Sequence, residues 1–316
     1  MQISILLPTF NRPHQLREAL ASLALQNRAL IREILVGDDT PAAGRSENQN
    51  VIAQSGLAGL VRYFPNDPPK GNYPNQWALG ERASGDYILI LHDDDQLCPG
   101  ALDSLAQACA AETVPAVKIW FGRVLMMNED GVVDQADSGD KGAFYGKSGA
   151  SSVKPVWEWC LKQSLPPNCA LFSRTTYVKL MRGPRDGNVG DWGLAVRLAN
   201  SGARGRFIAE DISRYRSHAI SLTNAGRGID VHYMYEIASQ LQVPPQRLAD
   251  KDQLMQRFAE VATTRYLRDG ERLLAWKCML SSHWRWTRRL SARGIATVLM
   301  LVTPAPCWRW AIRQRT

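Results

Sequence analysis

The chain has 316 residues, of which 45% are hydrophobic and 22% charged, a balance that supports one large domain with an appendage, or two modest domains, and argues against wholesale disorder. No apolar run approaches the roughly 18 residues of a membrane-spanning helix, and Pro8 interrupts the apolar N-terminus, so neither a span nor a secretory signal is expected. The formal net charge of +8 is concentrated after Glu271, where nine basic and no acidic residues occur, and this argues against a uniformly basic nucleic-acid-binding protein.

The first hundred residues alternate short apolar runs with amphipathic segments. Four runs read as buried strands that end at polar or proline residues: Ile3–Leu7, Ile34–Val36, Leu60–Phe64 and Tyr87–Leu91. Three segments read as helices: one with Leu16, Leu20 and Leu23 on a single face, one at Asn75–Ala83, and one marked by Leu102, Leu105 and Cys109. The alternation predicts an α/β fold with a mostly parallel sheet that helices cover on both faces.

Polar residues follow each of these strands: Thr9 and Asn11, Asp38 and Asp39, Asn66 and Asp67, and finally Asp93, Asp94 and Asp95. In open α/β sheets, ligands bind at the carboxyl ends of the strands, where the loops gather. We therefore expect these four loops to form one polar crevice.

Beyond Ala110 the pattern is looser. The apolar run Val117–Met127 and the turn residues 128–131 predict a hairpin, and the Gly/Ser-rich segment Asp137–Ser152 predicts a mobile loop. Asp191–Ala199 has helical character, and the chain is mainly helical beyond Thr223. We predict a two-part domain in residues 1–222, split near residue 110, followed by a helical basic region in residues 223–316.

The acidic run Asp93-Asp94-Asp95 is the first candidate for chemistry. Adjacent carboxylates raise each other's pKa, and a bound dication removes that cost by accepting oxygen ligands. An exposed acidic turn is the alternative, since charge runs are often only solvated. Asp38-Asp39 could cap a turn or accept a hydrogen bond from a nucleotide, and no glycine-rich phosphate loop follows any strand.

Three segments, in the same order and spacing, resemble the family 2 glycosyltransferases, which have the GT-A fold. They are the opening residues 3–12, the segment 33–39 that ends in Asp38-Asp39, and the segment 85–95 that runs into Asp93-Asp94-Asp95 and continues to Pro99-Gly100. The resemblance is firm over about the first 110 residues. Members transfer a sugar from a nucleotide-diphosphate donor, usually with inversion.

The resemblance implies roles for matching residues. Pro8, Thr9, Asn11, Asp38, Asp39, Asp93 and Asp94 would bind the donor nucleotide, and Asp94 and Asp95 would hold Mn²⁺ or Mg²⁺. Many members have Asp where this chain has His92, so the sequence leaves open which two of the three aspartates act as the functional pair, and Asp95 is preferred for the metal. The motif at Tyr215–His218 implies His218 as a further metal ligand.

Asp191 is the candidate general base. Gly190-Asp191 resembles the later Glu-Asp motif of the family, with Gly190 in place of Glu. An inverting transfer needs one base to take the proton of the acceptor hydroxyl. The alternative is an N-cap, a position where Asp is favoured.

The C-terminal segment interleaves arginine with tryptophan, as in residues 283–289 and 308–310. Such a segment favours peripheral contact with an anionic membrane surface, which would suit lipid-linked glycan acceptors. Packing of these tryptophans against the catalytic domain is the alternative, and nucleic acid is not expected as a partner. Six cysteines without metal-ligand spacing predict buried reduced thiols and a cytoplasmic protein at the inner face of the membrane.

The sequence thus predicts a metal-dependent inverting hexosyltransferase that adds single sugars in bacterial polysaccharide or lipid-linked glycan assembly. Sugar-1-phosphate nucleotidyltransferases are a competing class, but they begin with a glycine-rich loop that residues 8–12 lack. A non-catalytic membrane-associated scaffold with the same fold is the third hypothesis.

Overall fold

The computed structural model of the chain describes residues 1–166, 168–217 and 230–303. Its N-terminal part alternates strands and helices, as the apolar runs predict: β1 (Ile3–Thr9), α1 (Pro13–Ala24), β2 (Ile31–Asp38), α2 (Arg45–Gln54), β3 (Val61–Pro65), α3 (Asn72–Arg82) and β4 (Tyr87–Ile90). The four strands pair in parallel in the order β3-β2-β1-β4. Their carboxyl ends therefore meet at one edge, as expected for the crevice.

The second part of the sheet is mixed. The long strands β6 (Val117–Met127) and β10 (Arg204–Arg216) run parallel to each other, and β9 (Leu171–Ser173) joins β6 to β4 with antiparallel pairing on both sides. Three short strands complete the sheet by antiparallel pairing: β5 (Gln96–Leu97), β7 (Val133–Asp134) and β8 (Ser152–Pro155). The antiparallel β6–β7 pair confirms the predicted hairpin.

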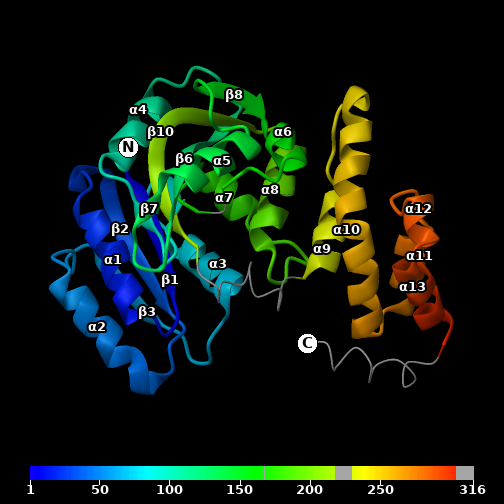
Figure 1. Cartoon of the computed structure of the whole chain (residues 1–316). Coiled ribbons are helices and arrows are strands. Elements are labelled where there is room, and N and C mark those ends of the chain that lie inside the picture. The colour runs from blue at the N-terminus through cyan, green and yellow to red at the C-terminus, as the bar shows by residue number, and fades with distance from the viewer. Residues whose placement is uncertain (167, 218–229, 304–316) are drawn as a thin grey trace.

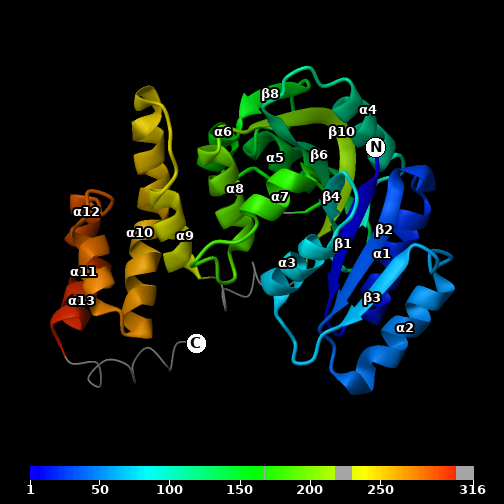
Figure 2. The same ribbon diagram turned by 180° about the vertical axis from the view of Figure 1, so that it is seen from behind.

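Helices cover both faces of the sheet (Figures 1 and 2). Along β1 the buried side chains alternate, so that Ile3, Ile5 and Leu7 pack with α1, α2 and α4 (Ala101–Ala110), whereas Leu6 faces the other way. The opposite face packs against α3 and against three later helices: α6 (Val156–Leu161), α7 (Arg174–Leu180) and α8 (Gly190–Asn200). Burial on both faces explains why the strand sequences are almost wholly apolar.

The loop prediction for Asp137–Ser152 is wrong in its first part, because α5 occupies Gln135–Phe144. The Asp134 carboxylate caps this helix by accepting a hydrogen bond from the Asp137 amide at 2.9 Å. Ser138 is buried, and its hydroxyl accepts from the Met126 amide of β6 at 2.8 Å. Polar contacts rather than an apolar stripe thus fix the helix, and its Gly/Ser content hides it from a hydrophobic pattern.

The C-terminal region is helical, as predicted, and comprises α9 (Val231–Ser239), α10 (Leu248–Asp269), α11 (Arg272–Leu280), α12 (Trp286–Arg289) and α13 (Ala292–Val302). The first half of α10 shares a core with α8, where the rings of Phe258 and Trp192 lie 6.2 Å apart. Its second half packs with α11 and α13 around the buried Tyr266 and Trp284. Within these described residues, no helix has the length and apolar character needed to cross a bilayer.

The five cysteines in the described residues are free thiols, as the spacing predicts, and Cys307 lies outside those residues. Burial is the main reason that the pKa of Cys160 and of Cys169 lies above its ordinary value. Both side chains are therefore protonated packing groups at neutral pH.

Candidate active site

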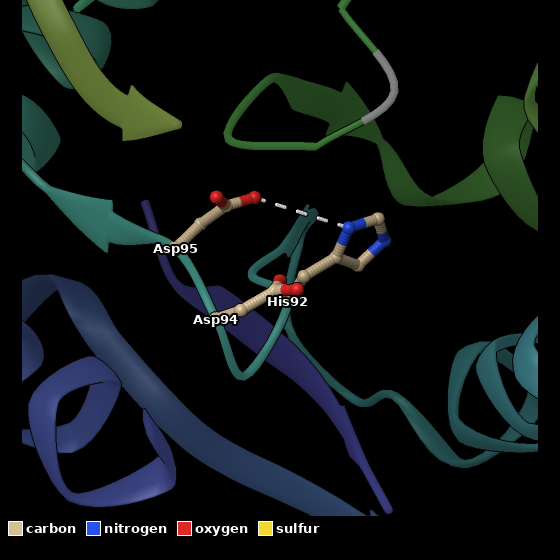
Figure 3. Close-up of side chains that lie close together, drawn as sticks. All are labelled: His92, Asp94 and Asp95. Carbon is tan, nitrogen blue, oxygen red and sulfur yellow. Dashed lines mark ion pairs between the residues drawn. The ribbon is translucent and has the colours of Figure 1, made fainter. Parts of the chain in front are cut away.

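The loop after β4 places three of its polar side chains close together, His92, Asp94 and Asp95 (Figure 3). One potential ligand atom from each of the three lies within 4.8 Å of the others, and His92 Nδ1 is 4.0 Å from Asp95 Oδ2. An imidazole nitrogen with two carboxylates is a donor set that suits a divalent cation such as Mn²⁺. The residues present therefore fit the metal that the sequence implies.

Asp95 is the buried member of this cluster. Its carboxylate accepts hydrogen bonds from the Asn168 side chain and, at 2.9 Å, from the Arg216 amide at the end of β10. Burial, and then the nearby Asp94 charge, hold the pKa of Asp95 well above its ordinary value. A cation at this position would stabilise the charged carboxylate.

His92 is flanked by two amide side chains, Gln76 at 3.2 Å from Nε2 and Asn168 at 3.3 Å from Nδ1. Burial lowers the pKa of His92, so the ring is neutral at physiological pH and retains a lone pair for a metal. The Asp94 carboxylate accepts a 2.5 Å hydrogen bond from Arg12, which supplies positive charge to the cluster.

Asp93 faces away from this cluster. Its carboxylate accepts hydrogen bonds from the Thr9 hydroxyl at 2.8 Å and the Phe10 amide at 3.3 Å, and Arg12 lies 3.4 Å away. Burial, and then Asp94, raise its pKa to about 6, although Arg12 opposes the shift. Asp93 and Thr9 therefore fasten the loop after β4 to the loop after β1.

Asp38 and Asp39 are both buried and fully engaged within the protein. Asp38 accepts hydrogen bonds from the Thr40 amide at 2.8 Å, from Asn48 at 2.9 Å and from Tyr63 at 2.7 Å. Asp39 accepts from Asn66 at 2.8 Å and from two amides of residues 70 and 71. These carboxylates shape the loops after β2 and β3, and their contact with a nucleotide stays a prediction.

Two further residues expected near the nucleotide differ in exposure. Pro8 is buried within β1, opposite Gly37 of β2. Asn11 is exposed, and its φ of 53° lies in the left-handed region, where its amide donates to the Thr40 hydroxyl at 2.9 Å. His218 lies outside the described residues.

Asp191 lies in the first turn of α8, but the N-cap is Val189, so the N-cap interpretation is wrong. Its carboxylate accepts from the Trp192 amide at 2.8 Å and forms a hydrogen bond with the Tyr73 hydroxyl. A Cβ on Gly190 would lie 2.7 Å from the Tyr73 ring, so a Glu side chain at this position would collide with Tyr73. Burial and then Asp191 raise the pKa of Tyr73, so the phenol stays a hydrogen-bond donor.

A cavity of about 690 Å³ joins these groups, since both Asp191 and Asn168 line it. Asn168 also contacts Asp95 and His92, so the candidate base and the acidic cluster border one space. Sequence reasoning missed Arg12, Tyr73, Asn168 and Gln76. Arg12 could have been found from its place beside Asn11 in the opening motif, whereas the other three lie in no recognisable pattern.

Residues 4–142 match the family model Glycosyl transferase family 2. Over 111 residues, the chain is 34% identical to the GalNAc(5)-diNAcBac-PP-undecaprenol beta-1,3-glucosyltransferase of Campylobacter jejuni. The aligned segment covers 34% of each protein. A second relative, an uncharacterized protein of Mycobacterium tuberculosis, is 30% identical over 105 residues. The chain thus aligns with about a third of the length of these curated relatives.

Among solved structures, S. aureus TarS in complex with UDP-GlcNAc superposes with a TM-score of 0.64 at 14% identity, over 88% of this chain and 80% of that chain. A mannosyltransferase from Pyrobaculum calidifontis in complex with GDP-Man and Mn²⁺ gives a TM-score of 0.54 at 17% identity, over 95% of this chain and 87% of that chain. These likenesses extend the fold over nearly the whole molecule. Residues 4–142 are thus similar to glycosyl transferase family 2, and the fold of the molecule is that of the GT-A glycosyltransferases.

Proposed function

We propose that this protein is an inverting glycosyltransferase that moves one sugar from a nucleotide-diphosphate sugar to an acceptor hydroxyl. The observation that carries the proposal is a shared cavity, which Asp191 lines directly and which reaches the His92–Asp94–Asp95 cluster through Asn168. A cation-binding group and a base on the two sides of one space are what a single displacement requires.

The cluster residues His92, Asp94 and Asp95 would hold Mn²⁺ or Mg²⁺, together with the predicted ligand His218. The bound ion would neutralise the charge that develops on the departing diphosphate. The Mn²⁺ in the mannosyltransferase complex supports this assignment by likeness of fold alone.

Asp191 would accept the proton of the acceptor hydroxyl as its oxygen attacks the anomeric carbon. The Trp192 amide and the Tyr73 hydroxyl fix the orientation of this carboxylate, so that it approaches the cavity in one geometry. Attack from the face opposite the leaving diphosphate inverts the anomeric centre.

The donor nucleotide would lie over the carboxyl ends of β1 and β2, near Asn11 and Asp39. The two superposed proteins were solved with UDP-GlcNAc and with GDP-Man, so the likeness of fold selects neither base nor sugar. Pro8, Thr9, Asp38 and Asp93 would act here by shaping the walls of the donor site, because each is buried.

We propose a lipid-linked glycan as the acceptor. The relative from Campylobacter jejuni is named for an undecaprenol-linked substrate, and the surface of the C-terminal region is suited to contact with a membrane. Ile295, Leu299 and Val302 of α13 are exposed and share one helical stripe. Trp286 is 73% exposed and stacks with the guanidinium of Arg289 at 4.6 Å. This combination supports peripheral contact with an anionic bilayer at the cytoplasmic face.

Calorimetric titration with nucleoside diphosphates, with Mn²⁺ and with EDTA, tests the proposal. We expect one nucleotide to bind only with the metal and Asp95→Asn to abolish that binding. Asp86→Asn is the matched control. Asp86 is an exposed carboxylate just before β4, whereas Asp95 lies in the loop that follows β4. Metal-dependent binding that survives Asp95→Asn, or the absence of binding by any nucleotide, would overturn the assignment.

A further inference from the structure

The cavity that Asp191 lines has an excess of positive charge among its lining residues. Five basic residues line it: Arg123, Lys141, Lys147, Lys162 and Arg257. Two aspartates line it as well, and one of them, Asp211, forms a 2.7 Å ion pair with Arg123. Four basic residues without this partner therefore line the cavity, and Asp191, the candidate base, is the other acidic residue that lines it.

Lys147 is the most informative of these cations. It is only 6% exposed, and its ammonium group lies 5.5 Å from the ring centroid of Phe121 and 5.9 Å from that of Tyr145. No carboxylate among the described residues pairs with it, and burial alone lowers its pKa to about 8. A buried cation without an anion is costly, so its place at a cavity wall indicates that the anion comes from a ligand.

The turn after α5 fixes the backbone of Lys147. The Lys147 amide donates to the Gly142 carbonyl at 2.7 Å, and Gly146 has a positive φ of 69° that turns the chain back on the helix. The Lys162 side chain lies against the same turn, since a Cβ on Gly146 would be 3.2 Å from its ammonium nitrogen. Lys147 and Lys162 thus both lie beside the turn that follows α5, and both line the cavity.

Arg257 adds a cation from a distant part of the chain. It lies on α10 between Leu254 and Phe258, which are buried in the core shared with α8. The position of its backbone relative to Asp191 is therefore fixed by packing. Four segments distant in sequence thus contribute basic residues to one cavity: β6 (Arg123), α5 with the turn after it (Lys141, Lys147), the end of α6 (Lys162) and α10 (Arg257).

We propose that this cavity is the acceptor site and that it takes an acceptor bearing a phosphate ester, bound by Lys147 and Lys162 while its hydroxyl meets Asp191. This assignment rests on the proposed function of the same site. Lysine binds phosphate as a point charge, and two such charges on a partly apolar wall discriminate an anionic acceptor from a neutral sugar. The phosphate ester and the reacting hydroxyl belong to one molecule that spans the cavity.

Binding of glycerol phosphate to the full chain in EDTA tests the assignment, because metal-dependent donor binding is then removed. We expect saturable binding to the wild type, at least tenfold weaker binding to Lys147→Met, and about threefold weaker binding to Lys162→Ala. Lys162 is exposed, so its variant tests the site without a risk to folding. Lys154→Met is the matched control: this lysine also stacks on an aromatic ring, 5.1 Å from Trp159, but does not line the cavity.

The inference is overturned if wild type, Lys147→Met and Lys162→Ala bind glycerol phosphate equally well. It is also overturned if the wild type binds glycerol as well as it binds glycerol phosphate, or if it binds glucuronate alone. Nucleotide binding with Mn²⁺ separates this inference from the proposed function. We expect Lys147→Met to bind the nucleotide with Mn²⁺ as the wild type does. If the wild type binds the nucleotide but glycerol phosphate binds independently of both lysines, only the acceptor assignment fails. If no nucleotide binds, the glycosyltransferase proposal fails first.

Discussion

Gly190 and Tyr73 show how one departure from a family motif changes the surroundings of a functional side chain. The ring of Tyr73 occupies the space that a side chain at position 190 would need, and its hydroxyl contacts Asp191 instead. Tyr73 is therefore a positioning residue for the candidate base. No local sequence pattern predicts this role of Tyr73, because its contact with Asp191 joins α3 to α8.

Tyr73→Phe removes this hydrogen bond and keeps the ring. We expect kcat to fall about tenfold, equivalent to roughly 1.4 kcal/mol in the barrier, while the donor KM and the melting temperature change little. Steady-state kinetics and a thermal melt check this split. An increase in KM with unchanged kcat would show that Tyr73 serves binding instead.

The three adjacent aspartates differ in surroundings although they are identical in sequence. Asp94 and Asp95 lie beside His92, whereas Asp93 accepts hydrogen bonds from the Thr9 hydroxyl and the Phe10 amide. We expect Asp95→Asn to abolish Mn²⁺ binding in the absence of nucleotide and Asp93→Asn to retain it, with affinities measured by electron paramagnetic resonance. Loss of Mn²⁺ binding in both variants, with the fold intact, would contradict this division.

Lys147 should carry a measurable cost in stability. Because its folded-state pKa of about 8 is below the ordinary value of 10.5, the unfolded chain binds more protons between these values, and the free energy of unfolding rises with pH through this window. Below pH 8 the buried charge is fully destabilising. Lys147→Met should therefore raise the free energy of unfolding by roughly 1–3 kcal/mol at pH 7, with a smaller gain at pH 10. Urea melts at both pH values measure this difference.

At the scale of the element, the strands β1 to β4, whose loops carry the candidate donor site, follow from the sequence because each is a continuous apolar run. The strand β9 does not, since its three residues pair with strands far away along the chain. The site divides in the same way. Asp95 was predicted from its own motif, but its partners Asn168 and Arg216 lie 73 and 121 residues away and reach it only through the folded sheet. Helix α2 also has too weak an apolar pattern to predict, with Val51 and Ile52 as its buried apolar residues.

Helix α5 offers a direct test of structure in the segment that looked like a loop. Asp134→Ala removes its N-cap and should lower the free energy of unfolding by about 1 kcal/mol. Asp140→Ala, an exposed change within the same helix, should alter it by less than about 0.5 kcal/mol. Equal effects in urea melts would argue against the capped helix.

At the scale of the whole molecule, the exposed apolar stripe of α13 predicts binding to a surface. Leu299→Glu places a charge on that stripe, and we expect it to reduce co-sedimentation with anionic vesicles severalfold while the melting temperature is kept. Thr303→Glu is a control for the added charge just beyond the helix. Equal sedimentation of wild type and Leu299→Glu, or none by the wild type, would contradict a membrane contact.

The helices between α8 and α13 form successive layers, with α9 and α10 between the sheet with its flanking helices and the outer helices (Figures 1 and 2). Successive packing contacts, of α8 with α9, of α9 with α10 and of α10 with α13, hold Asp191 at a fixed distance from the exposed stripe of α13. If that stripe rests on a bilayer, the helical region acts as a spacer of fixed height. It would favour acceptors whose reactive hydroxyl lies well above the lipid headgroups over acceptors whose reactive hydroxyl lies at the lipid surface.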